Sequence, residues 1–270
     1  MSSDRNDHLI TAEDLAAALG AGEPLRVLDI RFDPGKGSAR SRYLEGHIPG
    51  AVYVDLPTEL AGPKASTGGN LPLPDAAAFE QAARRWGLAS DSHVVVYDDT
   101  NGGPAARAAW VLRWAGLKNV RLLDGGYPSW RQLRPPVSII DEAPNAGTFQ
   151  ASIGDVKPLI ADDVAGWRGT VIDARPEKAF AEGHIPGAIN VPNSALVDDH
   201  GRLRSPAEIE QRLTARGVDL AAPIAVYCGG GVASSFTVIA LATLGKPAAL
   251  YPGSWSDWTT DPARPIAKQD

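Results

Sequence analysis

The sequence contains a single cysteine, Cys228, among its 270 residues. One cysteine excludes a disulfide within the chain and any zinc or iron–sulfur site built from several cysteines. Long apolar runs are also lacking: the longest candidate, residues 236–244, is about half of the roughly 18 residues that a membrane helix needs. We therefore expect a protein that does not span a membrane.

The sequence also lacks an excess of positive charge and a segment that resembles a secretory leader. The polar residues 1–7 contain no apolar stretch of the kind found in secretory signal peptides. The formal net charge of −6 argues against nucleic acid or an anionic membrane as the main partner. Because 44% of the residues are hydrophobic, the chain can build a sizeable core. These features predict a cytoplasmic globular protein with no nucleic-acid partner and no membrane partner.

The chain contains two copies of one sequence pattern. Residues 45–51, Glu-Gly-His-Ile-Pro-Gly-Ala, recur without change as residues 182–188. Further matches follow in the same order, and they pair 27–31 with 171–175, 93–98 with 223–228, and 123–126 with 251–253. A repeat this long exceeds the unit of a solenoid and indicates two copies of one domain.

A stretch rich in turn signals separates the two copies. Residues 134–154 contain three prolines and an Asn-Ala-Gly turn signal, which is a composition typical of a linker. We therefore predict a first domain at residues 1–135, a linker at residues 136–154 and a second domain at residues 155–270.

Strands and helices alternate in each copy. Short apolar runs predict strands, and stretches with helical spacing that end at a glycine predict helices. The predicted strands of the second copy are 170–174, 224–227 and 248–251, and its predicted helices are 206–216 and 234–244; the first copy has a matching helix at 105–115. Such alternation implies an α/β fold in which helices cover both faces of a parallel sheet, here in two tandem domains.

Cys228 directly follows a predicted strand and begins the run Cys-Gly-Gly-Gly-Val-Ala-Ser ahead of a predicted helix. Ligands of open parallel sheets bind at the carboxyl ends of the strands. Consecutive glycines allow a tight turn whose N–H groups point inward, and a helix N-terminus commonly lowers the pKa of a thiol from about 8.5. We therefore predict a nucleophilic Cys228 in a cradle formed by Gly229, Gly230, Gly231, Val232, Ala233 and Ser234.

Other interpretations of this turn are weaker. A buried, inert cysteine is the common alternative for a lone cysteine. The turn lacks the Lys-Ser/Thr ending of a P-loop and the Gly-x-Gly-x-x-Gly spacing of a dinucleotide site. A cysteine phosphatase needs an arginine six residues after the cysteine, where this chain has Ser234. Phosphate and nucleotide chemistry are therefore disfavoured.

Together these motifs resemble the two-domain rhodanese family, which comprises thiosulfate and 3-mercaptopyruvate sulfurtransferases. The resemblance rests on the duplicated Gly-His-Ile-Pro-Gly-Ala, the Asp-x-Arg strands, the Tyr-Cys-Gly-Gly-Gly-Val turn and the ending Tyr-Pro-Gly-Ser-Trp-Ser-Asp-Trp, and it covers about residues 11–258. It implies two similar domains with the active site between them. It also implies an inert first domain, because Asp98 stands at the cysteine position and a carboxylate cannot form a persulfide.

The resemblance implies a double displacement. The Cys228 thiolate would take the outer sulfur of a small anionic donor, becoming a persulfide, and would pass it to cyanide, a thiol or a protein thiol. No metal and no organic cofactor is implied. A persulfide carrier loaded by a protein donor is the main alternative, and a silent binding module is a further one.

Four residues outside the turn are candidates for binding the donor. Arg175 ends the strand next to the Cys228 strand, and its planar fork suits a sulfonate or a carboxylate; the alternative is a structural salt bridge. Lys178 is a weaker candidate. Phe32 matches a position where the family has an aromatic residue facing the active site, and both Phe32 and Trp255 could either line the cleft or belong to the core.

Both copies retain the histidine of the repeated motif. Because only one copy has the nucleophile, we expect His47 and His184 to play a structural role, binding backbone at the turn.

The identity of the sulfur donor stays open between two compounds. Residues 229–231 carry no basic side chain, which weakens thiosulfate, and residues 175–180 lack the second arginine of the mercaptopyruvate enzymes. The nearer match is to 3-mercaptopyruvate.

Overall fold

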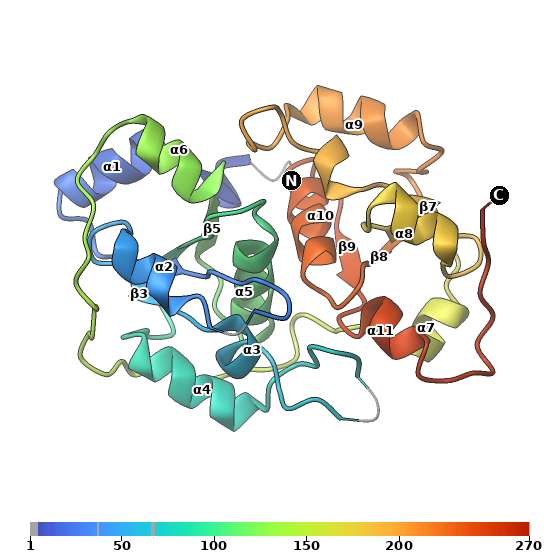
Figure 1. Ribbon diagram of the computed structural model, residues 1–270, viewed down its shortest axis with the longest axis horizontal. Coiled ribbons are helices and arrows are strands. Elements are labelled where there is room, and N and C mark those ends of the chain that lie inside the picture. The colour runs from blue at the N-terminus through green and yellow to red at the C-terminus, as the bar shows by residue number, and fades with distance from the viewer. Residues whose placement is uncertain (1–4, 37, 66–67, 270) are drawn as a thin grey trace.

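The computed structural model describes residues 5–36, 38–65 and 68–269. These residues form two α/β units that lie side by side (Figure 1). The sheet of the first unit has the strand order β1-β5-β4-β2-β3, and that of the second has β7-β6-β8-β9. All paired strands are parallel. The prediction of two tandem α/β domains is confirmed.

The nine strands of the described residues are short. Their bounds are β1 (Leu9–Ile10), β2 (Leu25–Asp29), β3 (Val52–Tyr53), β4 (His93–Tyr97), β5 (Val120–Leu123), β6 (Thr170–Asp173), β7 (Ile189–Asn190), β8 (Ile224–Tyr227) and β9 (Ala248–Leu250). In each unit the longest apolar strand, β4 or β8, lies inside the sheet and is buried on both faces. The three strands predicted for the second copy are all present, and two of them end one residue earlier than predicted.

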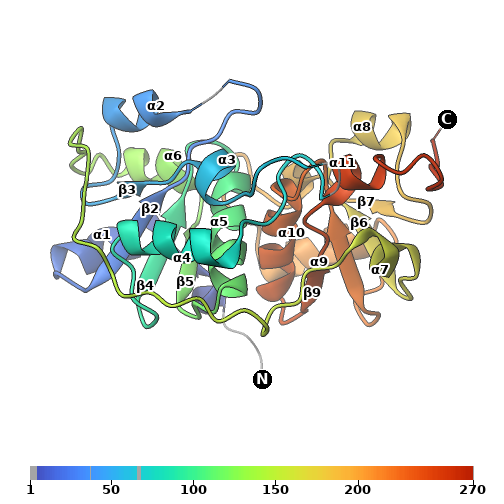
Figure 2. The same cartoon turned by 90° about the horizontal axis from the view of Figure 1, so that it is seen from below.

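Helices cover both faces of each sheet (Figure 2). In the first unit they are α1 (Ala12–Gly20), α2 (Arg40–Glu45), α3 (Leu56–Glu59), α4 (Ala76–Arg85), α5 (Gly103–Trp114) and α6 (Gly126–Gln132). In the second they are α7 (Ala161–Ala165), α8 (Glu177–Glu182), α9 (Pro206–Thr214), α10 (Ala233–Ala242) and α11 (Ser254–Trp258). The helices predicted at 105–115, 206–216 and 234–244 are confirmed with ends shifted by one or two residues. No helix among the described residues is long and apolar enough to cross a membrane.

Residues 136–154 contain no helix or strand, and they run along the first unit toward the second (Figure 2). Backbone hydrogen bonds tie them down, including one of 2.9 Å from Phe149 N to Leu88 O. The Phe149 ring is fully buried and lies edge-on to Phe79, with ring centroids 6.2 Å apart. The segment that connects the two units therefore packs against the first unit.

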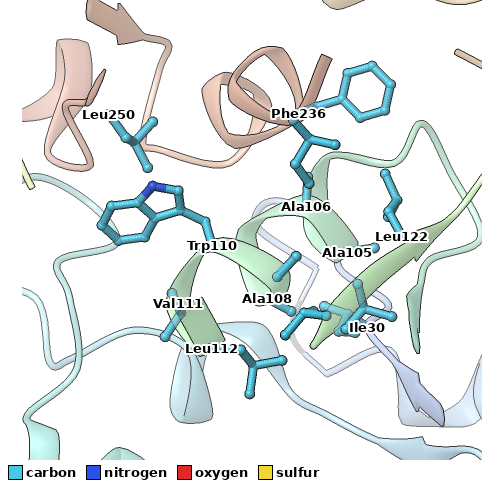
Figure 3. Packing of buried hydrophobic residues seen from close by; sticks show 14 of the residues in the cluster. Ile30, Ala105, Ala106, Ala108, Trp110, Val111, Leu112, Leu122, Phe236 and Leu250 are labelled. Atoms are coloured by element: carbon cyan, nitrogen blue, oxygen red, sulfur yellow. The ribbon is translucent and has the colours of Figure 1, made fainter. Parts of the chain in front are cut away.

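Helices α5 and α10 pack against each other where the two units meet. One apolar cluster continues through both units, and Figure 3 shows Trp110 of α5 beside Leu250 of β9. At Gly102, with φ +79°, an added Cβ would lie 2.7 Å from the Phe236 ring, so the close approach requires glycine. Because each of these helices follows the turn after a central strand, the turns after β4 and β8 both lie at this boundary.

Candidate active site

Cys228 is the first residue of the turn between β8 and α10, and its side chain is 2% exposed. It nevertheless lies at the edge of open space, because it lines a cavity of about 680 Å³. Both units contribute to the walls, which are Phe32, Asp33, Pro34, Gly35, Pro57, Asn70, Leu71, Thr100, Asn101, Gly103, Pro104, Cys228, Gly229, Gly230, Val232 and Ala233. The sulfur is thus buried and reachable from a cavity between the two units.

Hydrogen-bond donors surround the sulfur atom. Gly231 N donates to Cys228 Sγ at 3.1 Å, and Ser234 Oγ donates to it at 3.3 Å. Ser254 Oγ lies 3.9 Å from the sulfur and accepts a hydrogen bond of 3.1 Å from Cys228 N. Donors arranged in this way stabilise negative charge on a thiolate or on a persulfide, as the donors of an oxyanion hole do.

The predicted cradle residues divide into two groups. Gly231 and Ser234 contact the sulfur, whereas Gly229, Gly230, Val232 and Ala233 line the cavity. Gly231 has φ +80°, and an added Cβ there would lie 2.4 Å from Pro252 O. A glycine is therefore required at this position for the amide to reach the sulfur.

Ser254 is a site residue that the sequence analysis missed. Its backbone has φ +55°, in the left-handed region that disfavours side chains, and the matching position of the first unit is Gly126 with φ +56°. A serine in this conformation costs about 1 kcal/mol, and strain of this kind is typical of functional sites. In the sequence, the position is distinguished only by having a serine in the second copy of the turn where the first copy has a glycine.

In the first unit, Asp98 occupies the position of the cysteine, and it is buried. Its carboxylate accepts hydrogen bonds from Thr100 N at 2.9 Å, Gly102 N at 3.1 Å and Ala105 N at 3.0 Å. Burial raises the pKa of Asp98 although these backbone hydrogen bonds act in the opposite direction. The turn of the first unit is therefore occupied by the carboxylate of Asp98.

Arg175 does not line the cavity. Its Nε lies 3.0 Å from both carboxylate oxygens of Asp173, and its Nη2 donates to Asp173 at 2.6 Å and to Gly183 O at 2.7 Å. The guanidinium also stacks over the Trp255 ring, 4.5 Å from its centroid. With its Nε and Nη2 bound to Asp173 and Gly183 and its position outside the cavity lining, Arg175 is not placed to hold the anionic group of a donor, and our expectation is corrected in favour of the structural salt bridge.

The first unit repeats this salt bridge. Arg31 donates to both oxygens of Asp29 and, at 2.6 Å, to Gly46 O, the counterpart of Gly183 O. Because the first unit, which has no cysteine at this turn, has the same arrangement, the pair is part of the fold that the two units share.

Of the three weaker candidates, only Phe32 lines the cavity. Lys178 is exposed on α8 and takes no part in the walls. Trp255 lies under Arg175 outside the cavity lining, and its backbone N donates to Cys228 O at 2.9 Å. The last two residues are therefore not placed to touch a donor.

The two histidines bind backbone, as predicted. His47 Nδ1 lies 2.8 Å from Tyr43 O, and His184 Nδ1 lies 2.9 Å from Phe180 O. Each imidazole also stacks on the ring of the same residue, with centroids 3.8 Å and 3.7 Å apart. Both histidines hold the turn that precedes the next strand.

The acidic side chain in the cavity wall is paired with an arginine outside the wall. Asp33 of the wall is paired with Arg42, whose Nε also donates to Asp99 at 2.9 Å. The wall residues that the structure describes include no lysine or arginine.

Among the described residues there is also no cluster of three or more histidine, cysteine or acidic side chains that could hold a metal ion.

The wall from the first unit was largely missed by the sequence analysis. Phe32 was identified, but Asn70, Thr100 and Asn101 were not. These side chains reach Cys228 only through the packing of one unit on the other. No local pattern in the sequence signals such a contact.

Comparison with known proteins places this architecture in a family. The family model described as "Rhodanese-like domain" matches residues 11–133 and 154–261. SseB of Mycobacterium tuberculosis, provisionally named a thiosulfate sulfurtransferase, is 38% identical, with 98% of each chain covered. Thiosulfate sulfurtransferase of Gallus gallus is 34% identical, over 93% of this chain and 92% of that protein.

A solved structure gives the same result. SseA from Escherichia coli, described as a 3-mercaptopyruvate sulfotransferase with the rhodanese fold, matches with a TM-score of 0.83 and 33% identity. The match covers 92% of this chain and 98% of that one. This chain, with two tandem domains and a nucleophile-bearing turn in the second, therefore belongs to the rhodanese family.

Proposed function

We propose that this protein is a sulfurtransferase that carries a sulfane sulfur as a persulfide on Cys228. The observation that supports this most directly is the position of the sulfur, which borders a cavity between the two domains and accepts hydrogen bonds from Gly231 N and Ser234 Oγ. The full-length relatives bear the names thiosulfate and 3-mercaptopyruvate sulfurtransferase, which agrees with this chemistry.

The reaction takes place in two displacements. The Cys228 thiolate attacks the outer sulfur of the donor, the bond from that sulfur to the rest of the donor breaks, and the leaving group departs with the electron pair. From 3-mercaptopyruvate the leaving group is the enolate of pyruvate, which takes up a proton; from thiosulfate it is sulfite. A nucleophilic acceptor such as cyanide or a thiol then attacks the outer sulfur of the persulfide, and the thiolate is restored.

The protein's contribution is to hold charge and to exclude water. Gly231 N and Ser234 Oγ donate to the inner sulfur, while Gly229 and Gly230 of the same turn line the cavity in which the outer sulfur would lie. The apolar side chains of Phe32, Pro57 and Leu71 surround that space. No step in this scheme needs a metal or an organic cofactor.

Of the two donors, the cavity favours 3-mercaptopyruvate. At neutral pH thiosulfate carries two negative charges and 3-mercaptopyruvate carries one, and the described walls offer no basic side chain to offset either charge. A cavity of about 680 Å³ also has room for a carbon skeleton.

We assign the reaction to the cytoplasm, where a reducing environment keeps the single thiol free.

Steady-state rates with each donor, with cyanide as the acceptor and thiocyanate as the measured product, test the proposal. We expect turnover with a higher kcat/KM for 3-mercaptopyruvate, and no turnover by Cys228→Ser. If neither donor supports turnover but a cysteine desulfurase loads sulfur onto the wild-type protein, the protein is a carrier and the small-molecule donors are wrong.

A further inference from the structure

A buried cation lies next to the catalytic turn and comes from the inert domain. Arg107 of α5 has no exposed surface. Its Nη2 donates to Leu71 O at 3.1 Å, whereas its Nε and Nη1 have no hydrogen-bond partner. Among the described residues no carboxylate forms a salt bridge with it, unlike Arg31 and Arg175 of the two sheets.

A buried cation without a carboxylate is costly, because the protein interior replaces water with a poorly polarisable medium. Burial lowers the pKa of Arg107 to about 10, so the guanidinium still carries its proton at neutral pH. Such a charge indicates that an anion faces it in the working protein.

The candidate for that anion is the sulfur of Cys228. A Cβ added at Gly231 would lie 3.0 Å from Arg107 Nη1, and the amide of the same glycine donates to Cys228 Sγ at 3.1 Å. The guanidinium therefore adjoins the residue that holds the sulfur, and it does not line the cavity itself. In the second copy the corresponding position is Thr237, which instead bonds Asn193 Oδ1 at 2.9 Å.

We propose that Arg107 is a positioning residue of the first domain that supplies the positive charge opposite the anionic sulfur of Cys228. It acts through the glycine turn by stabilising the thiolate and, during turnover, the persulfide. The inert domain thus contributes the countercharge of the active site. This inference rests on the proposed function, because it assumes that Cys228 works as an anion.

Other charged groups near the turn are already paired. Asp257 of α11 accepts hydrogen bonds from the Tyr251 hydroxyl and from Gly68 N, each at 2.6 Å. Asp33 of the cavity wall is paired with Arg42. Both are acidic, so Arg107 is the group near the turn that favours a thiolate.

The test uses the single cysteine and needs no sulfur donor. The rate of alkylation by iodoacetamide, measured against pH, reports the thiolate of Cys228 alone. Arg107→Met should raise the midpoint pH of the alkylation rate by about one unit and lower the rate at pH 7 roughly tenfold. Arg107→Lys, which keeps the positive charge, should restore most of the wild-type rate. The matched control is Arg113→Met on the same helix, which should not move the midpoint.

Two results would overturn the inference. One is an unchanged midpoint in an Arg107→Met protein whose circular dichroism matches wild type, and the other is a midpoint of Arg107→Lys that lies a full unit above that of the wild type although the positive charge is kept. The second result can be obtained even if Arg107→Met does not fold. A midpoint that depends on Arg107, without sulfur loading from any donor, would uphold the inference and reject the proposed function.

Discussion

The turns after β4 and β8 occupy matching places in the two domains, but they differ in backbone conformation and are filled in different ways: the left-handed glycine is Gly102 in the first turn and Gly231, one position earlier, in the second. In the first, the Asp98 carboxylate takes up three backbone amides, so its anion-binding capacity is used by the protein itself. In the second, the sulfur of Cys228 accepts from one amide and one hydroxyl and borders the cavity. The difference teaches that the fold supplies an anion-binding turn twice, and that only in the second turn do a thiol, a neighbouring hydroxyl and the cavity come together.

The domains also differ one strand further along. Gly126 takes a left-handed conformation without strain, whereas Ser254 takes the same conformation at a cost and brings a hydroxyl to within 3.9 Å of the sulfur. At this position, therefore, strain is present in the domain that has Cys228 and absent from the other. By contrast, the salt bridges of Arg31 and Arg175 are alike in the two domains.

Exchanging the nucleophile between domains would break the comparison most severely. We expect Cys228→Ser combined with Asp98→Cys to lose roughly 10³-fold or more of the turnover. The transplanted thiol would lie at a position that does not line the cavity and has Gly126 where the active turn has Ser254. Thiocyanate production by the double variant measures the effect, and activity close to wild type would show that the two turns are equivalent.

Two neighbouring glycines sharpen the comparison further. Gly231→Ala should lower kcat by about 10²-fold, because the new Cβ would meet Pro252 O at 2.4 Å and displace the amide that holds the sulfur. The matched control is Gly229→Ala, where an added Cβ meets nothing within 4 Å. Equal losses of kcat in the two variants would contradict the account.

The strained serine gives a smaller effect. Ser254→Gly, which reproduces the first domain, and Ser254→Ala both remove the hydroxyl, and each should lower kcat about tenfold. The two should differ in stability, since alanine keeps the left-handed strain and glycine relieves about 1 kcal/mol of it. Kinetics and urea unfolding together separate the roles; if the hydroxyl has no part in catalysis, both variants will keep the wild-type kcat.

The smallest effect on activity is expected where the domains are alike. Arg175→Met leaves Asp173 buried without its partner and should lower the free energy of unfolding by about 3 kcal/mol. Arg31→Met should cost a similar amount through Asp29. Neither should change the KM for the donor in protein that remains folded. A selective rise in KM with Arg175→Met alone would return that residue to the donor site.

Local sequence patterns predicted most of the fold. The apolar run of β8 and the helical spacing before Gly245 gave α10 and its strand nearly to the residue, because short-range periodicity determines these elements. The glycine turn that follows a strand indicated Cys228, and the motif repeated at residues 45–51 and 182–188 indicated the structural histidines.

Long-range packing limited what could be predicted of the site. Arg175 looked free because a sequence does not show that a buried Asp173 two residues earlier folds back onto its guanidinium. Asn70 and Arg107 reach the turn from another domain, through contacts that only the packing of α5 on α10 creates. Ser254 was hidden because its importance depends on a backbone angle.

The most direct measurement of the central claim is the intact mass of the protein after incubation with 3-mercaptopyruvate or thiosulfate. The account predicts a gain of one sulfur atom that disappears on addition of cyanide and does not form in Cys228→Ser. A wild-type protein that gains no sulfur from either donor, or a Cys228→Ser protein that still gains it, would contradict the account.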